Sequence, residues 1–238
     1  MADEPLIERV LVITAHPDDV DFGAAGSVAT WTDAGIDVAY CIVTDGDAGG
    51  HDRSVSRREM VETRRAEQTA AAKHVGVDEL HWLGFPDGRV EATLELRREI
   101  SRVIREVRPQ RVLCPSPERN YQRIFASHPD HLAAGEASLC AVYPDARNPF
   151  AHPELLDAGL EPWTVPEVWM MATTTSDVFV DITDQIDRKL DALRSHVSQH
   201  QTPEMLDELI RGWGAMVAQG AGFPAGHYAE GFLRVATA

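Results

Sequence analysis

Short apolar runs and helical patterns alternate along this chain in strict order. The strand-like runs lie at residues 9–15, 38–44, 79–85 and 111–116, with later runs at 167–172 and 178–183. Helical patterns separate them near residues 24–34, 54–75, 91–107 and 130–143, and two more follow near 184–199 and 203–218. Such alternation predicts parallel strands joined by helical crossovers. Several runs are apolar on both faces, as a sheet covered on both sides requires. We therefore predict an α/β fold with a doubly wound, mostly parallel, Rossmann-like sheet and helices on both faces.

The chain has 238 residues, enough for one sizeable core, and we predict a single domain over residues 1–238. Internal repeats and low-complexity tracts are absent from the sequence. The segment Pro144–Pro166 breaks the alternation with several prolines and carries the aromatic residues Phe150 and Trp163. Because these aromatic side chains favour burial, we expect an ordered excursion over the sheet edge that forms a pocket wall or a subunit contact.

Two clusters of polar residues follow the first and fourth strand-like runs. His16–Asp19 reads His-Pro-Asp-Asp, and His128–His131 reads His-Pro-Asp-His. In the 3-2-1-4 strand order of many doubly wound sheets, strands 1 and 4 are neighbours and ligands bind outside their carboxyl ends. We therefore predict that the two clusters share one crevice. Their nitrogen and oxygen donors suit Zn²⁺ or a similar divalent ion.

A nucleotide is the usual ligand of such a crevice, but this chain lacks the G-x-G-x-x-G motif after its first strand. Gly23 and Gly26 come late and lack the required spacing, and the nearby aspartates would repel a pyrophosphate. The loops Asp45–Asp47 and Pro86–Gly88 follow the second and third runs, so we expect them to face the crevice, where they shape the pocket or form turns.

Acidic residues outnumber basic ones by 38 to 22, which gives a formal charge of −16. This charge repels phosphates, so we expect neither nucleic-acid binding nor stable membrane association. The acidic N-terminus lacks signal-peptide features, and no apolar run is long enough to span a membrane, which predicts a cytoplasmic protein. The three cysteines lack metal-binding spacing and are expected to be reduced thiols.

The two clusters match a known family. The chain resembles the PIG-L/LmbE-like zinc-dependent de-N-acetylases, which include the GlcNAc-phosphatidylinositol deacetylases and the deacetylases and amidases of mycothiol and bacillithiol metabolism. Ala15–Asp19 and His128–His131 carry the resemblance, and Arg64 ahead of Glu67 and Gly76 also fits it.

The chain also departs from its relatives at two places. Val20 follows Asp19 where many relatives have glutamate, and Ala126 and Ser127 stand where some thiol-sugar enzymes place a tyrosine, with Tyr121 further back. The core chemistry survives these changes, but they leave the pathway unassigned.

The resemblance implies that His16, Asp19 and His131 are the metal ligands, with water completing an open site. Zn²⁺ is the favoured ion, and Fe²⁺ fits the same ligands. Asp18 is then the expected general base, which takes a proton from the attacking water. The plainer interpretation of Asp18 is a cap for the following helix.

The remaining roles also follow from the resemblance. His128 would stabilise the tetrahedral oxyanion and supply a proton to the leaving amine, and Asp130 would orient and charge-stabilise His128. Asp130 could instead cap the helix that follows. Arg64 would contact sugar hydroxyls, or else form a surface pair with Glu62 or Glu67. The sequence assigns no role to the remaining histidines, such as His81 and His196.

We therefore predict a metal-dependent hydrolase that removes an N-acetyl group from an N-acetylglucosamine-type sugar or conjugate and releases acetate. Its partner would be a small N-acetylated sugar, and the sequence leaves a homo-oligomer open. Three alternatives remain: an amidase that cleaves a thiol-sugar conjugate, an esterase, and a metal-binding protein without turnover.

Overall fold

Seven strands form one mixed sheet in the computed structural model, which describes residues 6–50, 52–124, 127–200 and 202–237. In chain order the strands are β1 (Arg9–Thr14), β2 (Asp37–Thr44), β3 (Glu79–Phe85), β4 (Arg111–Pro115), β5 (Glu167–Met171), β6 (Val178–Asp181) and β7 (Ala229–Ala236). Their order across the sheet is β3-β2-β1-β4-β5-β7-β6. All strand pairs from β3 to β5 are parallel. The first and fourth strands are neighbours, as predicted. Ala126 and the first five residues lie outside the described residues.

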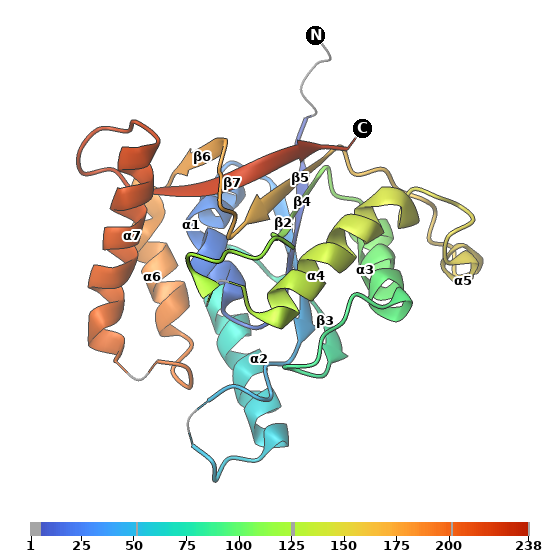
Figure 1. Ribbon diagram of the computed structural model, residues 1–238, viewed down its shortest axis with the longest axis horizontal. Helices are drawn as coiled ribbons and strands as arrows, with labels where there is room; N and C mark the ends of the chain where they lie inside the picture. The colour runs from blue at the N-terminus through green and yellow to red at the C-terminus, as the bar shows by residue number, and fades with distance from the viewer. Residues whose placement is uncertain (1–5, 51, 125–126, 201, 238) are drawn as a thin grey trace.

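Helices cover both faces of the sheet. They are α1 (Asp19–Asp33), α2 (Arg57–His74), α3 (Leu94–Val107), α4 (Pro129–Cys140), α5 (Pro153–Asp157), α6 (Ile186–Arg194) and α7 (Leu206–Gly220). Alternate residues of β1 face opposite sides: Leu11 and Ile13 pack with α3 and α4, whereas Val10 and Val12 pack with α1 and α2. Figure 1 shows α3 and α4 on one side of the sheet and α1, α6 and α7 on the other. The predicted α/β fold class is confirmed.

Both polar clusters stand at helix N-termini. Helix α1 begins at Asp19, earlier than the predicted start near residue 24, and Asp18 is its N-cap residue. The carbonyl oxygen of Asp18 accepts hydrogen bonds from the amides of Asp21 and Phe22. Pro129 occupies the first turn of α4, where the N–H that proline lacks would have no helical partner. None of the helices in the described ranges is long and apolar enough to cross a membrane.

Strand β7 was not predicted from the sequence, and it makes the sheet mixed. It lies between β5 and β6 and runs antiparallel to both. Its sequence includes Glu230 and Gly231, residue types that are depleted in strands. Glu230 is nevertheless buried, because its carboxylate accepts hydrogen bonds from the amides of Gly26 and Ser27 and from the ammonium group of Lys189.

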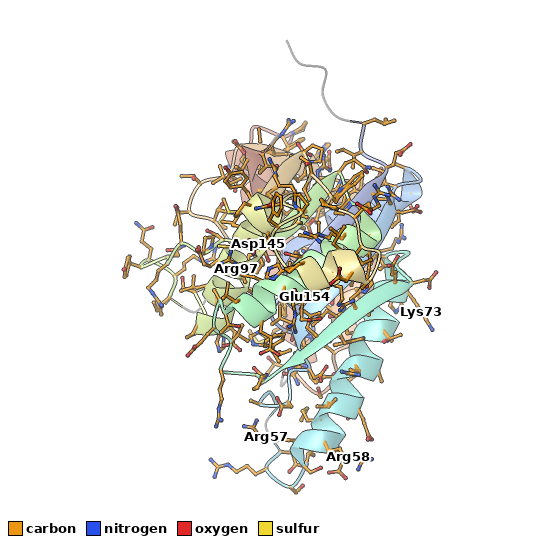
Figure 2. The ribbon with its side chains drawn as sticks, turned by 90° about the vertical axis from the view of Figure 1, so that its right-hand side faces the viewer. Arg57, Arg58, Lys73, Arg97, Asp145 and Glu154 are labelled. Carbon is orange, nitrogen blue, oxygen red and sulfur yellow. The ribbon has the colours of Figure 1, made fainter. Side chains whose placement is uncertain are left out.

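The segment Pro144–Pro166 packs on α3, which corrects the expected position over the sheet edge. Figure 2 shows Arg97 of α3 beside Asp145, and its guanidinium donates two hydrogen bonds of 2.8 Å to that carboxylate. Arg105, also on α3, donates to backbone carbonyls of the segment at Asp145, Ala146, Asn148, Ala151 and Leu160. Trp163 is half-buried, as expected, but Phe150 is 89% exposed. A subunit contact through this segment stays a prediction.

The buried Glu230–Lys189 pair yields a stability prediction. The side chains of Glu230 and Lys189 are only 6% and 4% exposed, so Glu230→Leu leaves a buried ammonium group without its charged partner. We expect a loss of about 3–5 kcal/mol in the free energy of unfolding, measured by urea denaturation. Asp191→Ala is the matched control, because it breaks the exposed pair with Arg194 and should cost about 0–1 kcal/mol. Equal effects of the two variants would contradict the prediction.

Candidate metal centre

The carboxyl ends of β1 and β4 lie side by side because these two strands pair in parallel. His16–Asp19 directly follows β1, and His128–His131 follows the loop that leaves β4. The two clusters meet there, with the Nδ1 atom of His16 3.2 Å from the Nε2 atom of His131. The structure thus brings the two clusters into one site at the switch point of the sheet.

The three residues expected to hold a metal bring their donor atoms together. The Nε2 atom of His131 lies 3.0 Å from Oδ1 of Asp19, and the Nδ1 atom of His16 lies 3.7 Å from Oδ2 of Asp19. Donors bound at about 2.1 Å to a tetrahedral zinc ion lie about 3.4 Å apart. The 3.2 Å between Nδ1 of His16 and Nε2 of His131 and the 3.0 Å between that Nε2 atom and Oδ1 of Asp19 are close to this value. Two imidazoles and one carboxylate leave a position open for water or substrate. The donor set therefore fits a divalent metal.

The other nitrogen of His16 faces two carboxylates. Its Nε2 atom lies 3.2 Å from Oδ2 of Asp130 and 3.1 Å from Oδ1 of Asp87. A metal-binding histidine commonly donates its second N–H to a carboxylate, which fixes the tautomer and the ring orientation. Asp130 also accepts hydrogen bonds from the amides of Gly88 and Val90. The Asp130 carboxylate therefore contacts His16, and its expected role in orienting and charge-stabilising His128 stays a prediction.

The charges of the cluster favour a cation at its centre. Burial would lower the pKa of His16, but hydrogen bonds to Asp130, Asp19 and Asp87 raise it to about 12. Burial likewise opposes ionisation of Asp19, yet His131 and His16 hold the pKa of its carboxyl well below the usual range. These carboxylates stabilise a positive charge, which can be carried by a proton on His16 or by a metal ion that displaces that proton.

Asp18 lies beside the cluster with different partners from Asp19. Its backbone has φ = 84°, a left-handed conformation that few residues with a Cβ adopt. Its amide donates to Oε1 of Gln68 at 2.7 Å, and its carboxylate accepts from Arg64 at 3.2 Å. Burial raises the pKa of Asp18 to about 7, with Arg64 opposing the shift and Asp19 adding to it. A pKa near the working pH suits a general base.

Arg64 is 3% exposed, so the alternative of a surface pair with Glu62 or Glu67 is wrong. Its guanidinium donates to the carbonyl oxygen of Pro17 as well as to Asp18. The glycine-rich loop at residues 45–50, which follows β2, packs directly on this group, because a Cβ at Gly49 would collide with Nη1 of Arg64. Arg64 therefore holds Asp18 in place, and its expected contact with sugar hydroxyls stays a prediction.

His128 is the exposed member of the cluster. Its ring centroid lies 5.0 Å from that of His16 and 5.4 Å from that of His131. Its Nδ1 atom accepts a hydrogen bond from the backbone amide of Asp130 at 3.3 Å, so the neutral ring carries its proton on Nε2. Burial and the positive charge on His16 lower the pKa of His128, although Asp130 opposes them. The ring can therefore offer Nε2–H to a bound oxygen.

Sequence reasoning missed three supporting residues: Gln68, Asp21 and His196. It did place the Pro86–Gly88 loop at the crevice, where Asp87 contacts His16, but it assigned Asp87 no individual role. Gln68 lies one helical turn from Arg64 and shares its buried face. His196 and Asp21 offer no local signal, because they are far apart in the sequence and meet only in the folded chain.

A doubly wound sheet with a His/Asp cluster at its switch point defines an α/β protein with a candidate metal centre. The chain belongs to the GlcNAc-PI de-N-acetylase (PIG-L) family, whose model matches residues 11–142 and so includes both clusters. The predicted family is confirmed. Metal dependence is typical of this family. Two groups of side chains in the cluster could hold an ion, His16 with His128 and His131 and His16 with Asp87 and Asp130, and Asp19 as a ligand stays a prediction.

Two sequence relatives are deacetylases of N-acetylated sugars. The chain is 39% identical over 226 residues to the diacetylchitobiose deacetylase of Thermococcus kodakarensis, covering 94% of this chain and 82% of the relative. It is 31% identical over 211 residues to a probable N-acetyl-α-D-glucosaminyl L-malate deacetylase of Bacillus cereus, covering 84% of this chain and 86% of the relative.

The structural relatives agree with the sequence relatives. The N,N'-diacetylchitobiose deacetylase of Pyrococcus horikoshii, solved with its inhibitor MPG, superimposes with a TM-score of 0.88 at 30% identity, covering 97% of this chain and 84% of that one. The predicted class of reaction, hydrolysis of an N-acetyl amide, is confirmed. The 4-carboxy-2-hydroxymuconate hydratase GalB of Pseudomonas putida, with a TM-score of 0.78 at 22% identity over 98% of each chain, shows the fold alone.

Removal of one expected ligand tests the metal centre. His131→Ala should lower metal affinity by more than about 100-fold, because an open three-ligand site cannot replace a lost imidazole. The metal-to-protein ratio after dialysis against metal-free buffer measures the effect. His81→Ala is the control, since His81 pairs with Glu79 on β3 outside the cluster. An unchanged metal content in His131→Ala would refute the assignment.

A second variant tests which histidine depends on the Asp130 carboxylate. Asp130→Asn should lower metal affinity by roughly 10–100-fold, because the Asp130 carboxylate contacts an expected ligand, His16. If Asp130 acted through His128 instead, metal affinity would be unchanged and only turnover would fall. Asp181→Asn removes a carboxylate from His227 elsewhere in the chain and serves as the control in the same metal titration.

Proposed function

We propose that the protein is a metal-dependent deacetylase that hydrolyses the acetamide of an N-acetylglucosamine disaccharide of the diacetylchitobiose type and releases acetate. One observation carries this proposal: the side chains of His16, Asp19 and His131 meet at one point. The carboxylate of Asp18, bound by Arg64, lies beside them. The 39% identity to a diacetylchitobiose deacetylase over nearly the whole chain supports this substrate ahead of the malate and inositol conjugates of more distant relatives.

In this proposal His16, Asp19 and His131 hold the ion, with Zn²⁺ favoured and Fe²⁺ compatible with the same donors. A bound divalent ion would acidify a water molecule and polarise the acetamide carbonyl. Asp87 and Asp130 keep Nδ1 of His16 free for the ion by binding its Nε2 side.

The other residues handle protons and developing charge. Asp18 accepts a proton from the water that attacks the acetamide carbon, which places negative charge on the carbonyl oxygen. His128 offers its Nε2–H to that oxygen. The C–N bond then breaks, the amine takes up a proton, and acetate and the free amino sugar leave. Asp18, which holds the proton from water, and His128 are the two candidate donors for this last step.

Two rival functions differ from the proposal in their products. A thiol-sugar conjugate amidase would release a carboxylic acid larger than acetate from the same site, and a metal-binding protein would release nothing. Fold alone does not choose among reactions, since a hydratase shares this architecture. The single domain over residues 1–238, the cytoplasmic location and a homo-oligomer stay predictions.

A product assay tests the function. Purified protein should release equal amounts of acetate and free amine from N,N'-diacetylchitobiose, with slower acetate release from N-acetylglucosamine and slower cleavage of the amide of a bulky cysteinyl conjugate. A chelator should abolish turnover, and Zn²⁺ should restore it. Asp18→Asn should lower kcat by roughly 10²–10⁴-fold with unchanged metal content, because a general base is lost.

Different results of this assay favour different functions. Cleavage of the cysteinyl conjugate in preference to acetamides would favour the amidase. Stoichiometric metal without turnover on any substrate would favour the binding protein. Full activity in Asp18→Asn would overturn the proposed base while leaving the deacetylase assignment intact.

A further inference from the structure

A hydrogen-bonded network of buried polar side chains connects a remote histidine, His196, to the backbone of Asp18. His196 follows α6, Asp21 lies in the first turn of α1, and Gln68 lies on α2. All three side chains are fully buried, with exposed fractions of 0%. Figure 1 shows α6 beside α1, and α6 also packs against α2. The hydrogen-bonded network therefore connects α1, α2 and the segment after α6 beneath the candidate active site.

Donor and acceptor are fixed at each hydrogen bond of this network. Oδ2 of Asp21 accepts from Nε2 of His196 at 2.8 Å and from Nε2 of Gln68 at 2.9 Å. Because the amide nitrogen of Gln68 is engaged by Asp21, its Oε1 atom faces the other way and accepts from the backbone N–H of Asp18 at 2.7 Å. The carboxylate of Asp21 thus decides which end of Gln68 meets Asp18.

Helix α2 contacts Asp18 and its neighbour at three places. Gln68 binds the backbone amide of Asp18, whereas Arg64, one turn earlier, binds the carboxylate of Asp18 and the carbonyl of Pro17. Together they surround a residue whose φ of 84° lies in the left-handed region. Such a conformation persists when the surrounding structure determines it. The position of the Asp18 carboxylate therefore depends on these contacts.

We propose that His196, Asp21 and Gln68 are positioning residues that fix the backbone of Asp18, and so aim its carboxylate at the attacking water. The inference rests on the proposed role of Asp18 as general base. Apolar side chains could fill the same volume without the desolvation cost of a buried carboxylate and imidazole. The hydrogen-bonded network instead supplies a directional contact to the backbone amide of Asp18, which lies next to the expected metal ligand Asp19.

His196 belongs to a segment that is anchored twice, which provides a matched control. The neighbouring anchor joins Ser198 to α2, where its amide and hydroxyl donate to the carboxylate of Glu67 at 2.7 Å each. Ser198→Ala weakens the attachment of this segment to α2 without touching Asp21 or Gln68. A role that merely attaches the segment would respond to both anchors alike.

The test compares kinetic constants at equal metal content. Gln68→Met keeps the length of the side chain and removes both hydrogen bonds, and His196→Leu removes the donor to Asp21. Each should lower kcat on N,N'-diacetylchitobiose by about 10–100-fold with little change in KM or bound metal, because a small displacement of a catalytic group slows the chemical step. His196→Gln can present an N–H near the position of the imidazole Nε2 and should restore most of the turnover.

The assay runs at a temperature where circular dichroism shows each variant to be folded. If Gln68→Met does not fold, the comparison of His196→Leu with His196→Gln tests the inference by itself. Unchanged kcat in His196→Leu, an equal loss in Ser198→Ala, or no recovery in His196→Gln would overturn the inference. Wild type and Asp18→Asn are measured alongside. An inactive wild type would reject the proposed function itself, whereas an inactive Asp18→Asn with fully active Gln68→Met would reject the positioning role alone.

Discussion

The parallel pairing of β1 with β4 is the constraint on which the site depends. The two strands end at the same edge, and the chain leaves them toward opposite faces of the sheet, into α1 and toward α4. A crevice opens where neighbouring crossovers diverge in this way. Residues separated by more than a hundred positions, such as His16 and His131, can then approach within hydrogen-bond distance without any distortion of the strands.

His16 occupies the centre of this arrangement because both of its ring nitrogens are used. Nδ1 faces Asp19 and His131, and Nε2 faces Asp87 and Asp130. One imidazole therefore joins the side where an ion would bind to the carboxylates that set its orientation and charge. The same geometry explains why the two aspartates after β1 differ: Asp19 turns toward the histidines, whereas α2 holds Asp18.

The sequence predicted what depends on local pattern and strand order. The parallel strands, the meeting of His16 with His131 and the family all follow from apolar periodicity and two short motifs. Strand β7 escaped prediction because Glu230 and Gly231 suit a strand only once Lys189 and α1 are beside it. The contact of the Asp130 carboxylate with His16 was not predicted, because a carboxylate can turn toward either neighbour, and packing of the Pro86–Gly88 loop decides between them. His196 could not be found at all, since its partner is set by helix packing.

The late position of β7 in the chain has a consequence for synthesis. During translation β5 emerges well before β7, and its edge stays unpaired until residues 229–236 have left the ribosome. Glu230 also reaches back to the amides of α1, close behind the first polar cluster. A nascent chain therefore carries both polar clusters while one flank of its sheet is still an open template for wrong pairing.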